Sequence, residues 1–211
     1  MTTASNETVH EHLLEVARSL TPSLSNAIEQ NGILTLSVQQ ESPFAERLCR
    51  AVAGQQLSVK AAASIWVRVV ESAPDGMDLT AHLYAVDTAV LRSCGLSGAK
   101  VKAVSAIAQA SHAGQLNATD LSKLSASERT ERLTALWGIG QWTADMMNLF
   151  YFGEPDIWPE GDVTARKTLE KLTSKRRKTM RTAERFKPYR SYLALHMWRH
   201  VDATPDKAPY G

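Results

Sequence analysis

The segment WGIGQWTAD at 137–145 constrains the fold most, because it places two glycines between two stretches of helical periodicity. Leu133 and Leu136 lie three residues apart at the end of the first stretch. Trp142 and Met146 lie four residues apart in the second, on one face of a helix. We therefore predict two helices joined by a connection of about four residues.

This connection is suited to bind an anion. Gly138 and Gly140 permit positive φ and keep side chains away from the backbone. The amides of such a turn, next to a helix N-terminus, form a site for a phosphate of a nucleic-acid backbone. A glycine pair also occurs in ordinary helix-helix turns, so the pattern alone leaves both interpretations open.

A second segment, PEGDVTARK at 159–167, places Asp162 directly before another helical pattern. Aspartate is a preferred helix N-cap, so a structural role is one interpretation. A carboxylate that stabilises positive charge in a transition state is the other. Asn caps a helix about as well as Asp does, so Asp162→Asn separates the two interpretations.

Both segments resemble the helix-hairpin-helix DNA glycosylases of base excision repair, and within them the DNA-3-methyladenine glycosylase II group, the alkylation-repair branch. The resemblance extends to four further segments, which are AGQQLSVKAA at 53–62, CGLSGAK at 94–100, ERFKPYRSY at 184–192 and LHMWR at 195–199. Together the segments span roughly residues 43–200 in the order expected for the family.

The resemblance implies an all-α fold in which two helical lobes flank a cleft, without an additional N-terminal β domain. Residues 1–211 would form one glycosylase unit. Lobe A would comprise approximately residues 43–165, and lobe B residues 1–42 together with 166–211. The hairpin and Asp162 would line the cleft.

The implied activity is the flipping and excision of alkylated purines, of the 3-methyladenine and 7-methylguanine type, from double-stranded DNA. Hydrolysis of the N-glycosidic bond would leave an abasic site. Asp162 falls at the catalytic aspartate of the family and would stabilise an oxocarbenium-like sugar. Members with lyase activity carry a lysine two residues after the second glycine, and this chain has Trp142 there, so we expect no lyase activity.

Two alternatives stay open. One is a glycosylase of the same superfamily that acts on deaminated bases. The other is a non-catalytic DNA-binding module that uses only the hairpin and a basic segment. The Asp162→Asn variant tests the second alternative, because a non-catalytic DNA-binding module would not need the carboxylate and would function unchanged without it.

The resemblance also assigns roles to further residues. Trp142, Trp198 and Met146 would form the base pocket, where an aromatic face attracts a cationic methylated purine. Core packing is the alternative for both tryptophans, and Met146 departs from the aromatic residue of some relatives. The residues implied to contact the DNA backbone are Gly138, Ile139, Gly140, Gln141 and Thr143. Gln56 or Leu57 would fill the gap left by the flipped base, and Lys100 would bind a phosphate. The backbone carbonyls of Thr134, Leu136 and Gly138 would bind Na⁺ or K⁺. Leu57 is equally well explained as a core residue.

Composition limits cofactors and location. The chain has 211 residues, of which 44% are hydrophobic, enough for a core. No apolar run of about 18 residues is present, so we expect no membrane partner and a cytoplasmic location. We also expect a monomer that associates with the bacterial nucleoid. Cys49 and Cys94 have no CxxC spacing, and we interpret both as buried thiols. Several relatives hold an iron-sulfur cluster on four C-terminal cysteines, which this chain lacks, so we expect no cluster and no required cofactor.

The net charge is only +2, but cations gather between residues 167 and 190. This basic run contains ten cations against the two acids Glu170 and Glu184. Its cations are Lys167, Lys171, Lys175, Arg176, Arg177, Lys178, Arg181, Arg185, Lys187 and Arg190. It is either a solvated face or a footprint for a DNA backbone.

Apolar periodicity and caps predict the remaining helices. Ser125 followed by Glu128 forms a capping-box pattern, which starts a helix near Ala126. Only GILTLSVQQ at 32–40 alternates as a strand does. The predicted helices cover 7–20, 22–31, 43–53, 58–72, 80–93, 98–113, 118–123, 126–136, 141–152, 163–172, 177–186 and 188–201.

Overall fold

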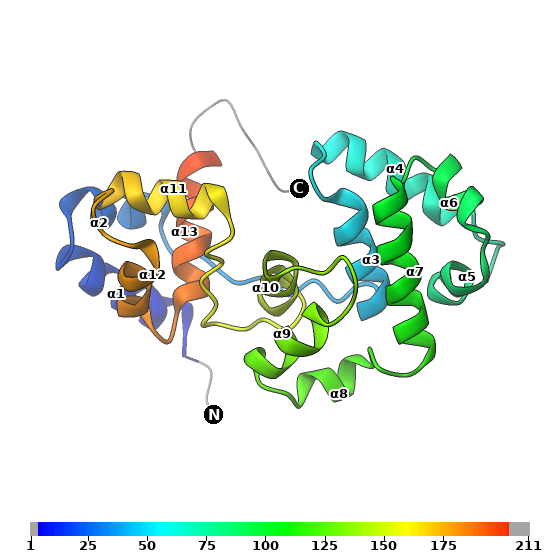
Figure 1. The fold of residues 1–211 in the computed structure, drawn as a ribbon. Helices are drawn as coiled ribbons and strands as arrows, with labels where there is room; N and C mark the ends of the chain where they lie inside the picture. The colour runs from blue at the N-terminus through cyan, green and yellow to red at the C-terminus, as the bar shows by residue number, and fades with distance from the viewer. Residues whose placement is uncertain (1–3, 203–211) are drawn as a thin grey trace. The chain divides into compact units, whose positions relative to one another are not determined.

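The computed structural model describes residues 4–202, and within them every regular element is a helix (Figure 1). The predicted all-α class is therefore confirmed. The helices are α1 (Asn6–Arg18), α2 (Pro22–Asn31), α3 (Phe44–Gly54), α4 (Val59–Glu71), α5 (Leu79–Ala85), α6 (Thr88–Ser93), α7 (Gly98–His112), α8 (Ala118–Ser122), α9 (Ala126–Thr134), α10 (Gln141–Phe150), α11 (Val163–Leu172), α12 (Thr179–Ala183), the 3₁₀ helix η1 (Glu184–Phe186) and α13 (Arg190–Asp202). None of the described helices combines the length and apolar character needed to cross a membrane.

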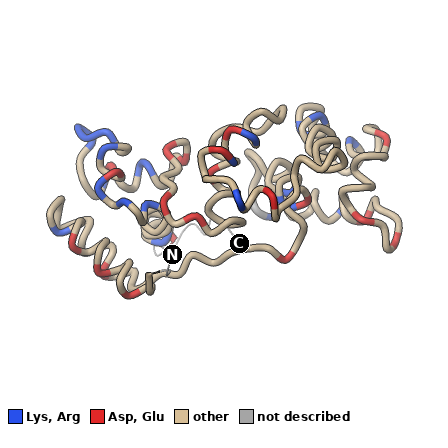
Figure 2. Tube along the Cα trace, turned by 90° about the horizontal axis from the view of Figure 1, so that it is seen from below, with Lys and Arg blue, Asp and Glu red and all other residues tan. Residues whose placement is uncertain are grey.

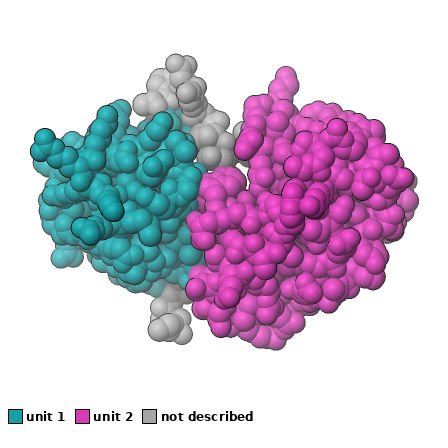
Figure 3. Space-filling model, viewed as in Figure 1, with its two compact units in different colours: residues 1–38, 148–209 teal, residues 39–147, 210–211 magenta. Residues whose placement is uncertain are grey.

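The chain divides into two compact units (Figure 3). Among the described residues, unit 1 comprises 4–38 and 148–202, and unit 2 comprises 39–147. The boundary lies within α10, between residues 147 and 148, so the segment 148–165 groups with the chain ends and not with lobe A as expected. Hydrogen bonds explain this grouping, because the first residues of α13 bind the segment before α11. The amide of Ser191 donates to the carbonyl of Pro155 at 3.0 Å.

Unit 1 is built around α11 and α13, which pack on each other and on α2. Their contact buries Leu169 and Leu193 completely, and α2 contributes Leu24 and Ile28 to the same unit. Thr21 caps α2 by accepting from the amide of Leu24 at 3.2 Å, and its hydroxyl donates to the carbonyl of Leu172 at 2.6 Å. One side chain therefore ties the start of α2 to the end of α11.

Unit 2 is built around α7, which packs on α3 and α5. The contact buries Leu48 and Val52 of α3 against Val104 and Ile107 of α7. Cys49 and Cys94 are both buried and unpaired, as interpreted from the sequence. Burial raises the pKa of the Cys49 thiol, so it stays protonated.

Two predicted helices differ from the structure. The segment 80–93 forms two helices, because Asp87 caps α6 by accepting from the amide of Ala89 at 2.8 Å. The segment 177–186 forms the short α12 followed by η1. Residues 32–40 form no strand, since no other strand is present in the described chain to pair with them. The helix predicted from the Ser125 capping box does begin at Ala126.

Candidate active site

Asp162 stands at the N-cap of α11, at the end of a tight turn. Its amide donates to the carbonyl of Pro159 at 2.8 Å, which orients the residue before the helix starts. Its Oδ1 accepts from the amide of Ala165 at 2.8 Å and from the indole Nε1 of Trp198 at 3.0 Å. The residue is only 4% exposed. The structural interpretation as a cap is confirmed, and it leaves the carboxylate buried and oriented by two donors.

Trp198 supplies the second of these donors from α13. The residue is 7% exposed, and its ring lies tilted against Phe150 with 5.8 Å between centroids. A buried tryptophan needs an acceptor for its N–H, and here the acceptor is the carboxylate. The indole therefore has an apolar packing contact and a polar contact with the candidate catalytic group.

The two glycines of the hairpin between α9 and α10 play different roles. Gly138 has φ of +85°, and a Cβ there would lie 2.6 Å from Cβ of Ala103 in α7. Glycine is thus required at this position by both conformation and packing. Gly140 lies outside the left-handed region, and a Cβ there would have no neighbour within 4 Å. Of the two glycines that permit positive φ, only Gly138 adopts it, and the backbone of Gly140 has open space beside it.

Two of the five residues expected to contact the DNA backbone are used inside the fold. The amide of Ile139 donates to the carbonyl of Leu136 at 3.1 Å, and its side chain is buried. Thr143 is 2% exposed, and its hydroxyl accepts from Nε2 of Gln55 at 3.0 Å. Gln141 is exposed, and its Nε2 donates a hydrogen bond to Oδ1 of Asp145 at 2.8 Å. Gly138, Gly140 and Gln141 are therefore the accessible part of the expected set.

Asp145 is a buried carboxylate that the sequence analysis did not single out. It is 5% exposed on α10, one turn after Gln141. Burial raises its pKa to about 6, and the hydrogen bond from Gln141 opposes this shift. The sequence signal that could have identified Asp145 as buried is its position beside the apolar residues Met146 and Met147.

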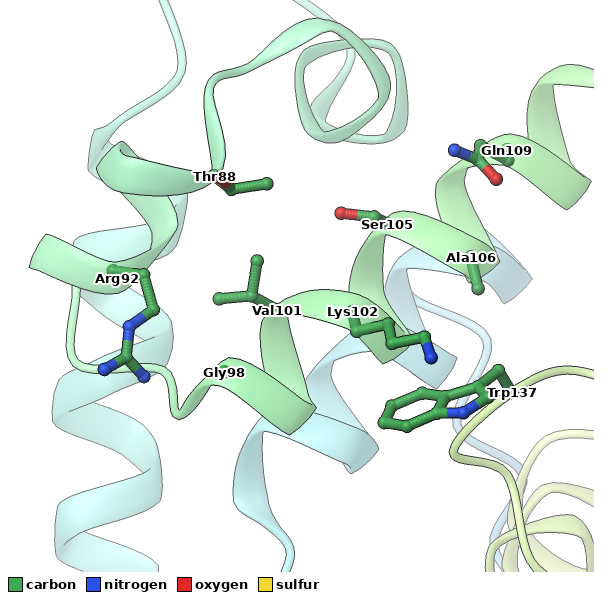
Figure 4. Close-up of a pocket in the computed structure, with 9 residues that line it drawn as sticks. All are labelled: Thr88, Arg92, Gly98, Val101, Lys102, Ser105, Ala106, Gln109 and Trp137. Atoms are coloured by element: carbon green, nitrogen blue, oxygen red, sulfur yellow. The ribbon is translucent and has the colours of Figure 1, made fainter.

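Of the remaining base-pocket candidates, Met146 is 9% exposed and Trp142 is half-buried, both on α10. A third tryptophan, Trp137, precedes the hairpin glycines and is 46% exposed. Nζ of Lys102 lies 4.3 Å from the centroid of this indole. Both residues line an open groove of about 540 Å³ on unit 2, together with Arg92 (Figure 4). No local sequence pattern predicts this groove, because its residues come from three separate segments.

The residues expected to fill the vacated stack lie between α3 and α4. Gln56 is exposed, and Leu57 is 40% exposed, so the alternative that Leu57 is a core residue is wrong. Lys100 does not present its ammonium to a ligand as expected. Its Nζ donates to the carbonyls of Ala53 and Gln55 at 2.8 and 2.7 Å, and desolvation lowers its pKa. Two of the three donors of this ammonium are therefore used inside the fold, contrary to the expected phosphate contact.

The carbonyls expected to hold a monovalent cation belong to the end of α9 and the turn after it. The carbonyl oxygen of Leu136 accepts a hydrogen bond from the amide of Ile139. A carbonyl oxygen has two lone pairs, so one remains for a cation. The hydroxyl of Thr134 donates to the carbonyl of Thr130 at 2.8 Å. Among the described residues no group of three His, Cys, Asp or Glu side chains could hold a metal ion.

The basic run lies in unit 1, and two of its cations are committed to ion pairs. Lys187 contacts Glu184 at 2.7 Å, and Arg190 contacts Asp156 at 2.7 Å. The cations of 175–178 line a hollow of about 270 Å³ (Figure 2 shows Lys and Arg in blue). This hollow also contains Arg166, whose buried Nε has no acceptor among the described residues. Lys167, Lys171, Arg181 and Arg185 are exposed as well, and 175–178 is the part of the run in which four consecutive cations are exposed.

Comparison with known proteins places this geometry in a family. Residues 49–190 match the HhH-GPD superfamily of base excision DNA repair proteins. DNA-3-methyladenine glycosylase 1 of Schizosaccharomyces pombe is 32% identical over 171 residues, which are 77% of this chain and 74% of that protein. DNA-3-methyladenine glycosylase 2 of Escherichia coli is 29% identical over 172 residues, or 77% of this chain and 60% of that protein.

A solved structure agrees with these relatives. The 3-methyladenine DNA glycosylase of Schizosaccharomyces pombe in complex with abasic DNA matches with a TM-score of 0.79 at 27% identity, covering 95% of this chain and 99% of that one. The chain therefore belongs to the HhH-GPD superfamily of base excision DNA repair proteins. Within it, the chain is a DNA glycosylase of the 3-methyladenine glycosylase family, and the resemblance stated from the sequence is confirmed.

Proposed function

We propose that this glycosylase flips alkylated purines of the 3-methyladenine and 7-methylguanine type out of duplex DNA and hydrolyses their N-glycosidic bonds, with Asp162 as the catalytic carboxylate. The observation that carries the proposal is the environment of Asp162. The residue is 4% exposed, and its Oδ1 is oriented by the amide of Ala165 and the indole of Trp198. A carboxylate held in this way needs little reorganisation when charge develops beside it.

The chemistry follows from the charge of the alkylated base. A ring-methylated purine is cationic and leaves as a neutral molecule, so positive charge passes to the sugar in the transition state. The carboxylate of Asp162 stabilises this oxocarbenium-like charge and orients the attacking water. The face of Trp142 attracts the cationic base by about 0.5–2 kcal/mol. Water adds to the sugar carbon and loses a proton to solvent, and the free base and an abasic site are the products.

DNA binding is assigned to the accessible hairpin residues and the exposed part of the basic run. Gly138 and Gly140 bring backbone amides to the surface beside the start of α10, where a phosphate is favoured. The solved relative from Schizosaccharomyces pombe holds abasic DNA, which supports the same ligand class here. The hairpin carbonyls of Thr134, Leu136 and Gly138 are the proposed ligands of a monovalent cation.

The strand stays intact after base release in this proposal. A lyase needs an amine that forms a Schiff base with the sugar, and the corresponding hairpin position is Trp142. Borohydride treatment during turnover should therefore trap no covalent adduct between the protein and DNA. A trapped adduct would contradict the monofunctional assignment.

A base-release assay tests the proposal directly. Wild-type protein should release 3-methyladenine and 7-methylguanine from methylated duplex DNA, and Asp162→Asn should release neither above background. The Asn variant keeps an Oδ1 acceptor for Ala165 and Trp198, so its fold is matched to the wild type. Base release from deaminated DNA alone would favour the alternative of a glycosylase of the same superfamily that acts on deaminated bases. Near-normal excision by the Asn variant would refute the role of Asp162.

A further inference from the structure

The turn between α3 and α4 is held in a conformation that L-residues rarely adopt. Gln56 has φ of +58°, and it is the one non-glycine residue with positive φ in the described chain. Its side chain is exposed, as is that of Leu57. A non-glycine residue stays in this region only when its surroundings impose the conformation.

Lys100 is the first of two groups that impose this conformation. Its amide donates to Oγ of Ser97 at 3.3 Å at the start of α7, so its backbone position is set by a helix cap. From there, Nζ donates to the carbonyls of Ala53 and Gln55 at 2.8 and 2.7 Å. These carbonyls lie at the C-terminal end of α3, where oxygens lack partners within the helix. A lysine ammonium satisfies them and is favoured by the helix dipole.

The second group is Thr143 on α10. Its hydroxyl accepts from Nε2 of Gln55 at 3.0 Å, and the residue is 2% exposed. Gln55 is therefore bound through its carbonyl by Lys100 and through its side chain by Thr143. The next residue, Gln56, is exposed. The two contacts hold the base of the turn and leave its tip exposed to solvent.

We propose that Lys100 is a positioning residue for the side chain that fills the gap left by the flipped base. This inference rests on the proposed function and on the sequence-based expectation that Gln56 or Leu57 fills the vacated stack, of which it takes Gln56, the residue with positive φ. An inserted side chain is effective only if its turn does not yield when it meets the DNA. The ammonium of Lys100, anchored on α7, supplies this resistance without touching DNA itself.

Single-turnover excision of 7-methylguanine from a methylated duplex tests the proposal. The variants are Lys100→Met, Gln56→Ala and the double variant, and Met keeps the bulk of the lysine stem without its charge. We expect each single variant to lose about 10- to 100-fold in rate. The double variant should be no slower than Gln56→Ala, because both changes act through the same inserted side chain. Fully additive losses would overturn the proposal, as would an unchanged rate for Lys100→Met or for Gln56→Ala.

Binding to undamaged duplex at several salt concentrations separates positioning from phosphate contact. Lys100→Met should leave the slope of log K against log salt unchanged. A slope shallower by about 1 would mean that Lys100 binds a phosphate, and the proposal would fail. Lys123→Met, which removes an exposed lysine at the C-cap of α8, is the matched control for loss of one charge. Should Lys100→Met fail to fold, Thr143→Val removes the second contact and has to show the same non-additivity with Gln56→Ala.

The outcomes also separate this inference from the proposed function. If wild-type protein releases methylated purines and Lys100→Met excises 7-methylguanine at the same rate as wild-type protein and Lys123→Met, only the positioning role is lost. If wild-type protein releases no base from methylated DNA, the proposed function itself is lost.

Discussion

At the scale of single residues, Asp162 combines a structural and a chemical task on one side chain. Oδ1 accepts two hydrogen bonds, from Ala165 and from Trp198, and both can be kept by an Asn oxygen. We therefore expect Asp162→Asn to change the free energy of unfolding by less than about 0.5 kcal/mol. Asp162→Ala loses both acceptors and should be destabilised by about 1–3 kcal/mol. Urea unfolding of the two variants measures the difference, and equal stabilities would contradict the hydrogen bonds described above.

A second prediction at this scale concerns Asp145. Its pKa is raised to about 6 by burial, above the ordinary value of 3.8, so the folded state binds a proton more tightly than the unfolded state does. This contribution to stability is fully present below about pH 4 and is lost as pH rises through 6. Asp145→Asn should therefore raise the free energy of unfolding by about 1–3 kcal/mol at pH 8, and by much less at pH 4. Urea titrations at the two pH values measure this, and a pH-independent difference would argue against a buried, ionising Asp145.

At the scale of elements, the hairpin shows how two identical residues serve different purposes. Gly138 approaches α7 closely enough that a Cβ would collide with Ala103, whereas Gly140 has open space. Gly138→Ala should destabilise the protein by about 1–3 kcal/mol. Gly140→Ala should leave stability within about 0.5 kcal/mol and weaken binding to abasic duplex, because the methyl group occupies the space beside the amides. Thermal unfolding and DNA titration of both variants provide the measurements, and a stable Gly138→Ala protein would refute the close approach.

The elements were also the scale at which local sequence signals worked best. The Ser125 capping box and the apolar spacing before the hairpin correctly predicted α9 and α10, since caps and periodicity depend on residues within a few positions of each other. The break at Asp87 was missed because the apolar periodicity continues across it. The alternation at 32–40 did not outweigh the helical patterns in the prediction, and the segment forms no strand.

At the scale of the whole molecule, charge matters through its distribution. The net charge is +2, yet the segment 175–178 presents four consecutive cations. We expect Arg176→Gln combined with Arg177→Gln to reduce the slope of log K against log salt for undamaged duplex by about 2, because each phosphate contact contributes about 0.9. Lys187→Gln is the matched control, since Lys187 is paired with Glu184 at 2.7 Å. An unchanged slope in the double variant would make the segment a solvated face.

The sequence by itself determined the helical class, the hairpin, the position of Asp162 before α11 and, through its resemblance to relatives, the family. These features are encoded by residues close together in the chain or by motifs kept in order along it. Only the tertiary structure decided that Trp198 donates to Asp162 across 36 positions. It also decided that Lys100 serves the turn at Gln55 across 45 positions and that Gly138 lies against Ala103. The partner of a side chain depends on which distant segments pack together, and packing is a property of the folded chain that no local pattern contains.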